Sequence, residues 1–279
     1  MSYVSPYFNE YREVDEIVNR DGEKKVFDIL DNHYTQLRKF TKGVCDDQFH
    51  LIVNGDAGMG KTEIVNWVVE NNTSDNVNVF RLSGSVTPVR LFSRLQDYAN
   101  KGDVFIVDDT DKILEDQESL EILKGALDTN QKNVSWSKYT NVLRNENKRT
   151  TFAYRGRMII ITNKFLANAP TETPTIQQQR VAPVLDRCVY FKAGVPNNDW
   201  KIWAIRLFAS NYKSKYSDYT YSLDFFQNYP KGKQEEVINW IETNKERLTK
   251  LSFRTVQQIM DLKESEPEMW KEMATSFLI

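Results

Sequence analysis

The stretch that decides the fold is a run of eight residues, Gly55-Asp56-Ala57-Gly58-Met59-Gly60-Lys61-Thr62. It matches the phosphate-binding pattern G-x-x-x-x-G-K-[ST] at every fixed position. In such a loop the glycines let backbone N–H groups turn inward around phosphates, the lysine reaches the β and γ phosphates, and the hydroxyl ligates Mg²⁺. We therefore predict that all eight residues bind phosphate groups and that Thr62 is a Mg²⁺ ligand.

The residues on either side have the periodicity that this loop requires, with an apolar run at 51–53 before it and a helical pattern at 63–70 after it. Further apolar runs alternate with helical patterns, which predicts a parallel sheet covered on both faces. The expected strands are 51–53, 77–80, 104–107, 158–161 and 189–191, and the expected helices between them are 63–70, 88–98 and 118–127.

From residue 195 onward the pattern is helical only, at 198–209, 223–226, 234–243, 255–263 and 266–277. The predicted organisation is an N-terminal arm of residues 1–12, an α/β nucleotide-binding domain of residues 13–194 and a small α-helical lid domain of residues 195–279. The fold class is α/β, a P-loop NTPase sheet between helices followed by an all-α lid.

A second motif lies downstream, where the apolar run Val104–Val107 ends in Asp108 and Asp109. A carboxylate at the end of a buried parallel strand is the expected partner of Mg²⁺. We predict that Asp108 holds the metal through water and that Asp109 activates the attacking water. The alternative is a solvated acidic turn, since four more acidic residues are near: Asp103, Asp111, Glu115 and Asp116.

At this point the sequence resembles the AAA+ ATPases, over residues 13 to 263. The segment Ile159–Asn163 is similar to the sensor-1 strand of that family, which implies that Asn163 orients the attacking water. The segment Pro183–Cys188 resembles the Ser-Arg-Cys segment of clamp-loader subunits, with Asp186 in place of serine. The resemblance makes Arg187 the arginine finger, offered to the γ phosphate of a neighbouring subunit.

The segment Leu251–Thr255 is similar to the sensor-2 helix start, so Arg254 would contact the γ phosphate. Each of the three assignments has an alternative. Asn163 would be a turn or cap, Arg187 a surface arginine with Arg180 as a second finger candidate, and Arg254 an ordinary basic helix start.

The resemblance implies ATP and Mg²⁺ as cofactors and self-association into a ring, expected to be a hexamer, or a partial ring. The branches it suggests are the clamp-loader or initiator type and the viral superfamily-three helicases. One departure is that the family has Asp-Glu where this chain has Asp108-Asp109. Since aspartate is one methylene shorter, slow hydrolysis or a switch used in the ATP-bound state is a further reading.

Residues 129–157 give the clearest indication of what such a ring acts on. Seven basic residues and four aromatic ones share this segment with a single acidic residue, Glu146; they are Lys132, Lys138, Arg144, Lys148, Arg149, Arg155, Arg157, Trp136, Tyr139, Phe152 and Tyr154. Charge suits a nucleic-acid backbone and rings suit stacking, so DNA or RNA is the expected partner. The alternative is a solvated loop whose aromatic rings pack on the sheet.

Three functions follow from these motifs: a nucleic-acid-directed ATPase in replication, helicase loading or helicase-like work; a protein-remodelling ATPase; or a slow assembly switch. The loop 83–88 lacks the aromatic residue that protein unfoldases place after the second strand, which disfavours remodelling.

Composition sets the remaining bounds. The 279 residues carry a formal charge of −2, and two cysteines and two histidines are too few and too dispersed for a zinc site. No stretch approaches the roughly 18 apolar residues of a membrane span. We therefore expect a cytoplasmic protein with reduced thiols.

Overall fold

The computed structural model describes residues 2–3, 14–73, 77–128, 130, 133–164 and 175–279. The chain divides into two compact units. The first comprises Met1–Val4, Leu37–Gly55 and Lys61–Ala193, and the second Ser5–Gln36, Asp56–Gly60 and Gly194–Ile279. Of the expected N-terminal arm, only Ser2 and Tyr3 belong to the described residues.

The first unit is built on a six-stranded sheet in which every neighbouring pair is parallel. In spatial order the strands are β1 (Ser2–Tyr3), β8 (Cys188–Lys192), β2 (His50–Asn54), β7 (Arg157–Thr162), β4 (Val104–Asp108) and β3 (Val79–Ser83). Strands β2 and β4 are buried along their whole length. Continuous apolar strands are typical of a parallel sheet covered on both faces, as the sequence predicted.

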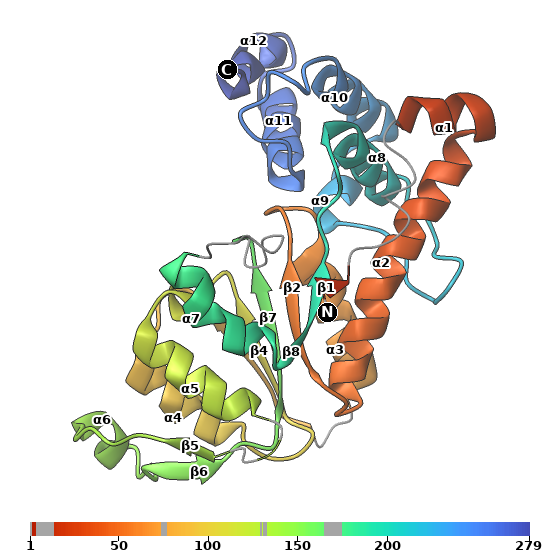
Figure 1. The fold of residues 1–279 in the computed structure, drawn as a ribbon. Coiled ribbons are helices and arrows are strands. Elements are labelled where there is room, and N and C mark those ends of the chain that lie inside the picture. The colour runs from red at the N-terminus through yellow and green to blue at the C-terminus, as the bar shows by residue number, and fades with distance from the viewer. Residues whose placement is uncertain (1, 4–13, 74–76, 129, 131–132, 165–174) are drawn as a thin grey trace. The chain divides into compact units, whose positions relative to one another are not determined.

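Helices cover both faces of this sheet (Figure 1). On one face lie α4 (Pro88–Asp97), α5 (Gln117–Leu127) and α7 (Ile176–Leu185); on the other lie α3 (Lys61–Asn72) and the part of α2 (Glu23–Cys45) that belongs to this unit. Side chains of successive strand residues point to opposite faces of the sheet. Ile52, Phe105 and Ile160 join the core beneath α4 and α5, whereas the ring of Phe191 meets Phe40 of α2 at 5.6 Å.

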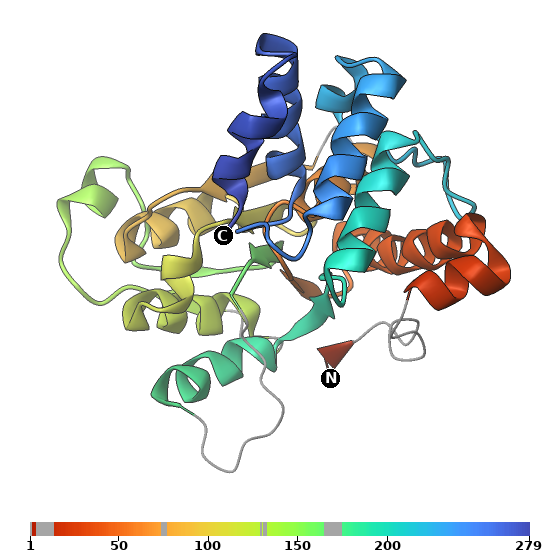
Figure 2. The same ribbon diagram turned by 90° about the horizontal axis from the view of Figure 1, so that it is seen from above.

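The first unit also contains a two-stranded antiparallel hairpin, which lies between α5 and β7 in the sequence (Figures 1 and 2). It consists of β5 (Asn133–Ser135), β6 (Thr151–Ala153) and, between them, α6 (Asn141–Asn145). The sequence predicted neither strand, because three residues are too few for a clear alternation. Val134, Leu143 and Phe152 pack into the main core, so the base of the hairpin is anchored by apolar contacts.

The second unit is helical. It contains α1 (Val14–Asp21), the start of α2, α8 (Asn198–Ala209), α9 (Asp224–Gln227), α10 (Lys231–Thr243), α11 (Phe253–Ser265), α12 (Trp270–Ala274) and the 3-10 turn η3 (Thr275–Phe277). The helix expected at 266–277 is shorter than predicted, because Pro267 lacks the N–H that a helix interior needs.

The parallel sheet covered by helices on both faces, and the helical character of the C-terminal part, agree with the fold class that the sequence predicted. Strand β3 lies two to three residues later than expected, at the sheet edge, where partial exposure weakens its apolar pattern. Among the described residues, none of the helices combines the length and apolar character that crossing a membrane demands.

A buried carboxylate organises the second unit. Asp31 of α2 is fully buried, and its Oδ1 accepts hydrogen bonds from Ser214 Oγ at 2.7 Å and Tyr221 OH at 2.8 Å. Its Oδ2 accepts from the backbone N–H of Lys215 at 2.8 Å. These bonds fix the loop after α8 against α2.

We expect Asp31→Ala to lower the free energy of unfolding by about 2–4 kcal/mol, because buried donors lose a charged acceptor. Asp28→Ala is the matched control: it lies three residues earlier on the same helix, accepts from Tyr212 OH at 2.9 Å, and is partly exposed. Its cost should stay near about 1 kcal/mol. Urea denaturation measures both, and equal losses would contradict a special role for Asp31.

Candidate functional site

The parallel register brings three polar strand ends to one edge of the sheet. Asn54 at the end of β2 is level with Thr162 of β7, and Asp108 at the end of β4 is level with Ile161. The phosphate loop follows Asn54 directly, while Asp109 and Asn163 follow the other two strands. Residues distant in sequence therefore converge beside the loop.

Lys61, Asn163 and Asp109 form a chain of hydrogen bonds. The ammonium group of Lys61 donates to Asn163 Oδ1 at 2.9 Å and to the backbone oxygen of Gly55 at 2.8 Å. Asn163 Nδ2 in turn donates to Asp109 Oδ1 at 2.7 Å. The structure thus brings together the predicted phosphate-binding lysine, the predicted water-orienting amide and the predicted base.

Thr62 and Asp108 form a second contact at this edge. Thr62 Oγ1 donates to Asp108 Oδ1 at 3.2 Å, so the two predicted metal-site oxygens are neighbours. Burial and the adjacent Asp109 carboxylate raise the pKa of Asp108, against the opposing effect of the Thr62 hydrogen bond. A cation near this carboxylate would offset that penalty. One hydroxyl and one carboxylate also fit Mg²⁺, which takes few protein ligands and keeps water or phosphate for the rest.

Asp109 has a left-handed backbone, with φ of 50°. Aspartate is among the few non-glycine residues that adopt this region readily. Thr110 stabilises the turn by donating its hydroxyl to the backbone oxygen of Asp108 at 3.0 Å. The turn directs the Asp109 carboxylate to Asn163, beside the lysine.

The middle of the phosphate loop, Asp56–Gly60, belongs by its contacts to the helical unit. The backbone oxygen of Gly58 accepts from the N–H of Phe253 at 2.9 Å. That of Met59 accepts from Tyr34 OH at 3.4 Å, and Asp56 forms an ion pair with Lys201 at 2.7 Å. Helices α2, α8 and α11 therefore each hold one part of the loop.

Arg254 lies near this part of the loop. Ser252 caps α11 by accepting from the N–H of Thr255 at 3.3 Å, which leaves Arg254 in the exposed first turn. A β-carbon added to Gly58 would lie 3.9 Å from Arg254 Cγ, so the arginine stem is adjacent to the loop backbone. The contact between Arg254 and a bound phosphate stays a prediction.

Arg187 lies at the other end of the sheet. It directly precedes β8, whose first residue is level with His50 at the start of β2, whereas the phosphate loop follows the end of β2. At roughly 3.3 Å per residue, five residues of strand separate the two ends by about 17 Å. The guanidinium donates to the backbone oxygen of Pro183 at 2.6 Å and contacts Asp128 at 3.5 Å.

The basic segment 129–157 differs from its sequence interpretation in its aromatic residues. Tyr154 is 1% exposed and Phe152 is 9% exposed, and Trp136 packs against Phe92 with ring centroids 5.8 Å apart. The expectation that bases stack on Phe152 or Tyr154 is therefore wrong, because both rings are buried in the core, whereas Trp136 is half-buried and its stacking stays a prediction. Lys132 lies outside the described residues.

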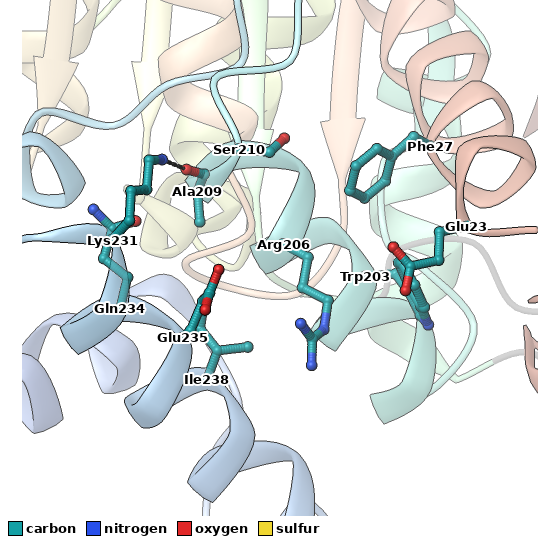
Figure 3. A pocket seen from close by; sticks show the side chains of 10 residues that line it. All are labelled: Glu23, Phe27, Trp203, Arg206, Ala209, Ser210, Lys231, Gln234, Glu235 and Ile238. Atoms are coloured by element: carbon teal, nitrogen blue, oxygen red, sulfur yellow. Dashed lines mark hydrogen bonds between the residues drawn. The ribbon is translucent and has the colours of Figure 1, made fainter.

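A separate hollow of about 310 Å³ lies in the helical unit, between α2, α8 and α10 (Figure 3). Phe27 and Trp203 form part of its wall. Its two basic side chains already have partners: Arg206 donates to Glu242 at 2.6 Å and to Asn239 at 3.0 Å, and Lys231 donates to the backbone oxygen of Ala209. No predicted site residue lines this hollow.

Tyr34 and Lys201 are contacts of the phosphate loop that sequence reasoning missed. A tyrosine and a lysine in amphipathic helices carry no motif, and their relation to the loop arises only from tertiary packing. A signal for Phe253 did exist, since it lies within the segment that resembles sensor-2.

We expect Gly60→Ala to weaken ATP binding more than about tenfold, because the substitution strains the loop backbone and crowds its neighbour. Gly60 has φ of +83°, and an added β-carbon would lie 3.0 Å from Phe208 Cζ. Gly84→Ala is the control: its φ is +82°, so the backbone strain is matched, but nothing lies within 4 Å of the added carbon. Nucleotide titration should show a loss for Gly60→Ala alone; equal affinities of both variants would show that the close packing is irrelevant to binding.

No family model matches this chain. An uncharacterized 36.7 kDa protein of Enterobacteria phage T4 is 23% identical over 253 residues, which are 89% of this chain and 74% of that protein. Two structures of Thermotoga maritima RuvB are similar in fold. A mutant form of RuvB gives a TM-score of 0.47 at 12% identity and covers 95% of this chain and 72% of its own. The structure described as a Holliday junction branch migration motor gives a TM-score of 0.43 at 11% sequence identity. The match covers 96% of this chain and 72% of the RuvB chain.

Proposed function

We propose that this protein binds and hydrolyses ATP with Mg²⁺ as an AAA+ ATPase, working as a ring or partial ring directed at nucleic acid. The observation that carries the proposal is the hydrogen-bonded chain from Lys61 through Asn163 to Asp109, beside Thr62 and Asp108. It combines a phosphate-binding cation, an amide and a carboxylate within reach of one another, which phosphoryl transfer to water requires.

In the proposed reaction Lys61 exchanges Asn163 and the Gly55 carbonyl for phosphate oxygens. The amide of Asn163 is then available, together with Asp109, to hold the attacking water. Asp109 accepts a proton from that water as the water oxygen attacks the γ phosphorus in line. The bond from the γ phosphorus to the β–γ bridging oxygen breaks, and ADP and inorganic phosphate are the products. The left-handed turn at Asp109 keeps the carboxylate at the sheet edge instead of extending it along the strand.

Thr62 and Asp108 are the residues that would hold the metal ion. When bound, Mg²⁺ would neutralise charge that develops on the phosphate oxygens. Asp108 is held in place by the hydroxyl of Thr62, and its raised pKa marks a carboxylate whose charge is only partly compensated by the protein.

Arg187 is proposed to act on the nucleotide of a neighbouring subunit. What supports this role is its position at the sheet end opposite to its own phosphate loop, too far away for an arginine side chain to reach. The Asp128 contact at 3.5 Å is long and partly exposed, so it restrains the guanidinium weakly. Hydrolysis would then depend on assembly.

Arg254 is proposed to contact the γ phosphate from the helical unit. Two observations support the proposal: the Arg254 side chain lies next to Gly58, and the backbone N–H of Phe253 donates a hydrogen bond to the backbone oxygen of Gly58. A change at the phosphate would reach α11 through these contacts.

The nucleic-acid part rests on the hairpin of β5 and β6, whose segment presents basic side chains such as Arg149 and Arg155 on its exposed surface. Stimulation of hydrolysis by single-stranded DNA tests it; stimulation by an unfolded protein instead would favour remodelling. A slow assembly switch is the second candidate, favoured by the short Asp109 side chain, and tight ATP binding with negligible turnover would support it.

We expect Asp109→Asn to retain ATP and Mg²⁺ binding but to suppress turnover by about 10²-fold or more, because an amide cannot accept the proton. Lys61→Ala should instead abolish tight ATP binding, since the phosphates lose their cation. Titration with ATP and a phosphate-release assay separate the two effects. Turnover of Asp109→Asn within a few-fold of wild type would mean that another group is the base.

We expect Arg187→Ala to leave ATP binding nearly intact and to reduce hydrolysis by about 10³-fold. Arg180→Ala on α7, the second finger candidate, is the matched control. Mixing Arg187→Ala with Asp109→Asn subunits should restore part of the activity at interfaces that pair intact residues. A wild-type turnover per subunit that stays constant down to proven monomer would exclude a finger in trans.

A further inference from the structure

A hollow of about 370 Å³ lies in the first unit, between the end of α4 and strand β6. Its polar lining consists of Gln96, Asn100, Arg149 and Arg155, and Phe152 contributes an apolar wall. None of these residues belongs to the phosphate loop or the metal site described above.

The walls are fixed by hydrogen bonds. The side chain of Gln96 pairs with the backbone of Arg149, accepting from its N–H at 2.9 Å and donating to its oxygen at 2.9 Å. The N–H of Arg155 donates to the backbone oxygen of Ala99 at 2.8 Å. The backbone before strand β6 is thus held against α4, and the backbone after β6 is held against the residues that follow α4, so the hollow is formed before any ligand arrives.

The charge of the hollow is uncompensated. Within the described part of the chain, neither guanidinium of Arg149 or Arg155 has an ion pair or side-chain hydrogen bond, and both residues are exposed. The nearby carboxylate of Asp97 is occupied by Lys148 and Arg94, and that of Asp103 is buried and accepts from Asn78 and Asn100. The lining therefore presents two free cations, two amides and no acid.

Two planar guanidinium groups suit phosphate oxygens, which they bind in pairs of parallel hydrogen bonds. The rings that would stack on bases are inaccessible here, since Tyr154 and Phe152 are buried. The chemistry favours a ligand recognised by its phosphates and not by its bases.

We propose that this hollow binds the phosphodiester backbone of a nucleic acid, with Arg149 and Arg155 each contacting a phosphate. The inference rests on the nucleic-acid part of the proposed function and gives it a location. Asn100 and Asp103 precede β4, so the hollow lies at the end of the sheet away from the phosphate loop. Backbone recognition implies that single strands and duplexes of any sequence bind.

The test compares two double variants of the full chain that remove equal charge. Arg149→Gln with Arg155→Gln empties the hollow of its cations. Lys138→Gln with Arg144→Gln removes two cations from the same hairpin segment, outside the hollow. Fluorescence anisotropy with labelled single strands and duplexes of about 30 nucleotides, over a range of salt concentrations, gives the affinities. The ATPase without nucleic acid and the melting temperature are measured in parallel.

The hollow variant should bind about tenfold or more weakly, with a salt slope lower by about 1.4 for single strands and about 1.8 for duplexes, as expected for two lost phosphate contacts. The control should lose less than about threefold, and both should keep the basal ATPase. Equal losses in the two variants, or no loss in either, would overturn the site while leaving the nucleic-acid function standing. A strong preference for single strands or for one base would overturn backbone recognition. Wild-type protein that binds no strand even at low salt would refute both the site and the nucleic-acid function.

Discussion

The parallel register of β2, β7 and β4 determines where the polar side chains at the sheet edge of the phosphate site lie. Because the three strands end within one residue of one another, the loop after β2, the amide after β7 and the carboxylates at the end of β4 meet at one edge. The strands themselves are apolar and buried on both faces, so the sheet is rigid and the polar groups follow only at its end. A slip of one residue in β7 would carry Asn163 about 3.3 Å away and break its bonds to Lys61 and Asp109.

The residues of the predicted phosphate loop divide between the two units: Gly55, Lys61 and Thr62 belong to the first and Asp56–Gly60 to the second. Lys61 begins α3 and contacts the sheet edge, while Asp56, Gly58 and Met59 are held by Lys201, Phe253 and Tyr34. Two of these three contacts use backbone oxygens of the loop, which depend on its conformation and not on its side chains. A rearrangement of α11 would therefore act on the loop backbone directly.

Much of this architecture could be predicted from the sequence, because the signals were local. Apolar runs predicted the central strands, and the helix at 198–209 begins and ends as expected. The hairpin strands and α7 carried no strong period. The rings of Phe152 and Tyr154 were misread because an aromatic residue among basic ones has the same local pattern whether it faces solvent or core. Contacts such as that of Phe152 with Phe92, at 5.1 Å, distinguish the two.

The contacts around the site could be predicted only in part. Motif spacing indicated which residues to compare, yet the bond between Asn163 and Asp109 depends on two strand ends that lie far apart in the sequence. Tyr34 and Lys201 lie in helices whose sequence pattern predicts a helix but does not predict which of its side chains contact the loop. Pairing of Lys148 with Asp97 likewise needs tertiary placement, and it changes which basic side chains of the hairpin are free.

The positive φ of Asp109 restricts which residue types this position accepts. A left-handed backbone is tolerated by aspartate better than by glutamate, so the aspartate suits the shape of the turn. Exchanging the side chain alone would lengthen the carboxylate arm while straining the peptide that aims it.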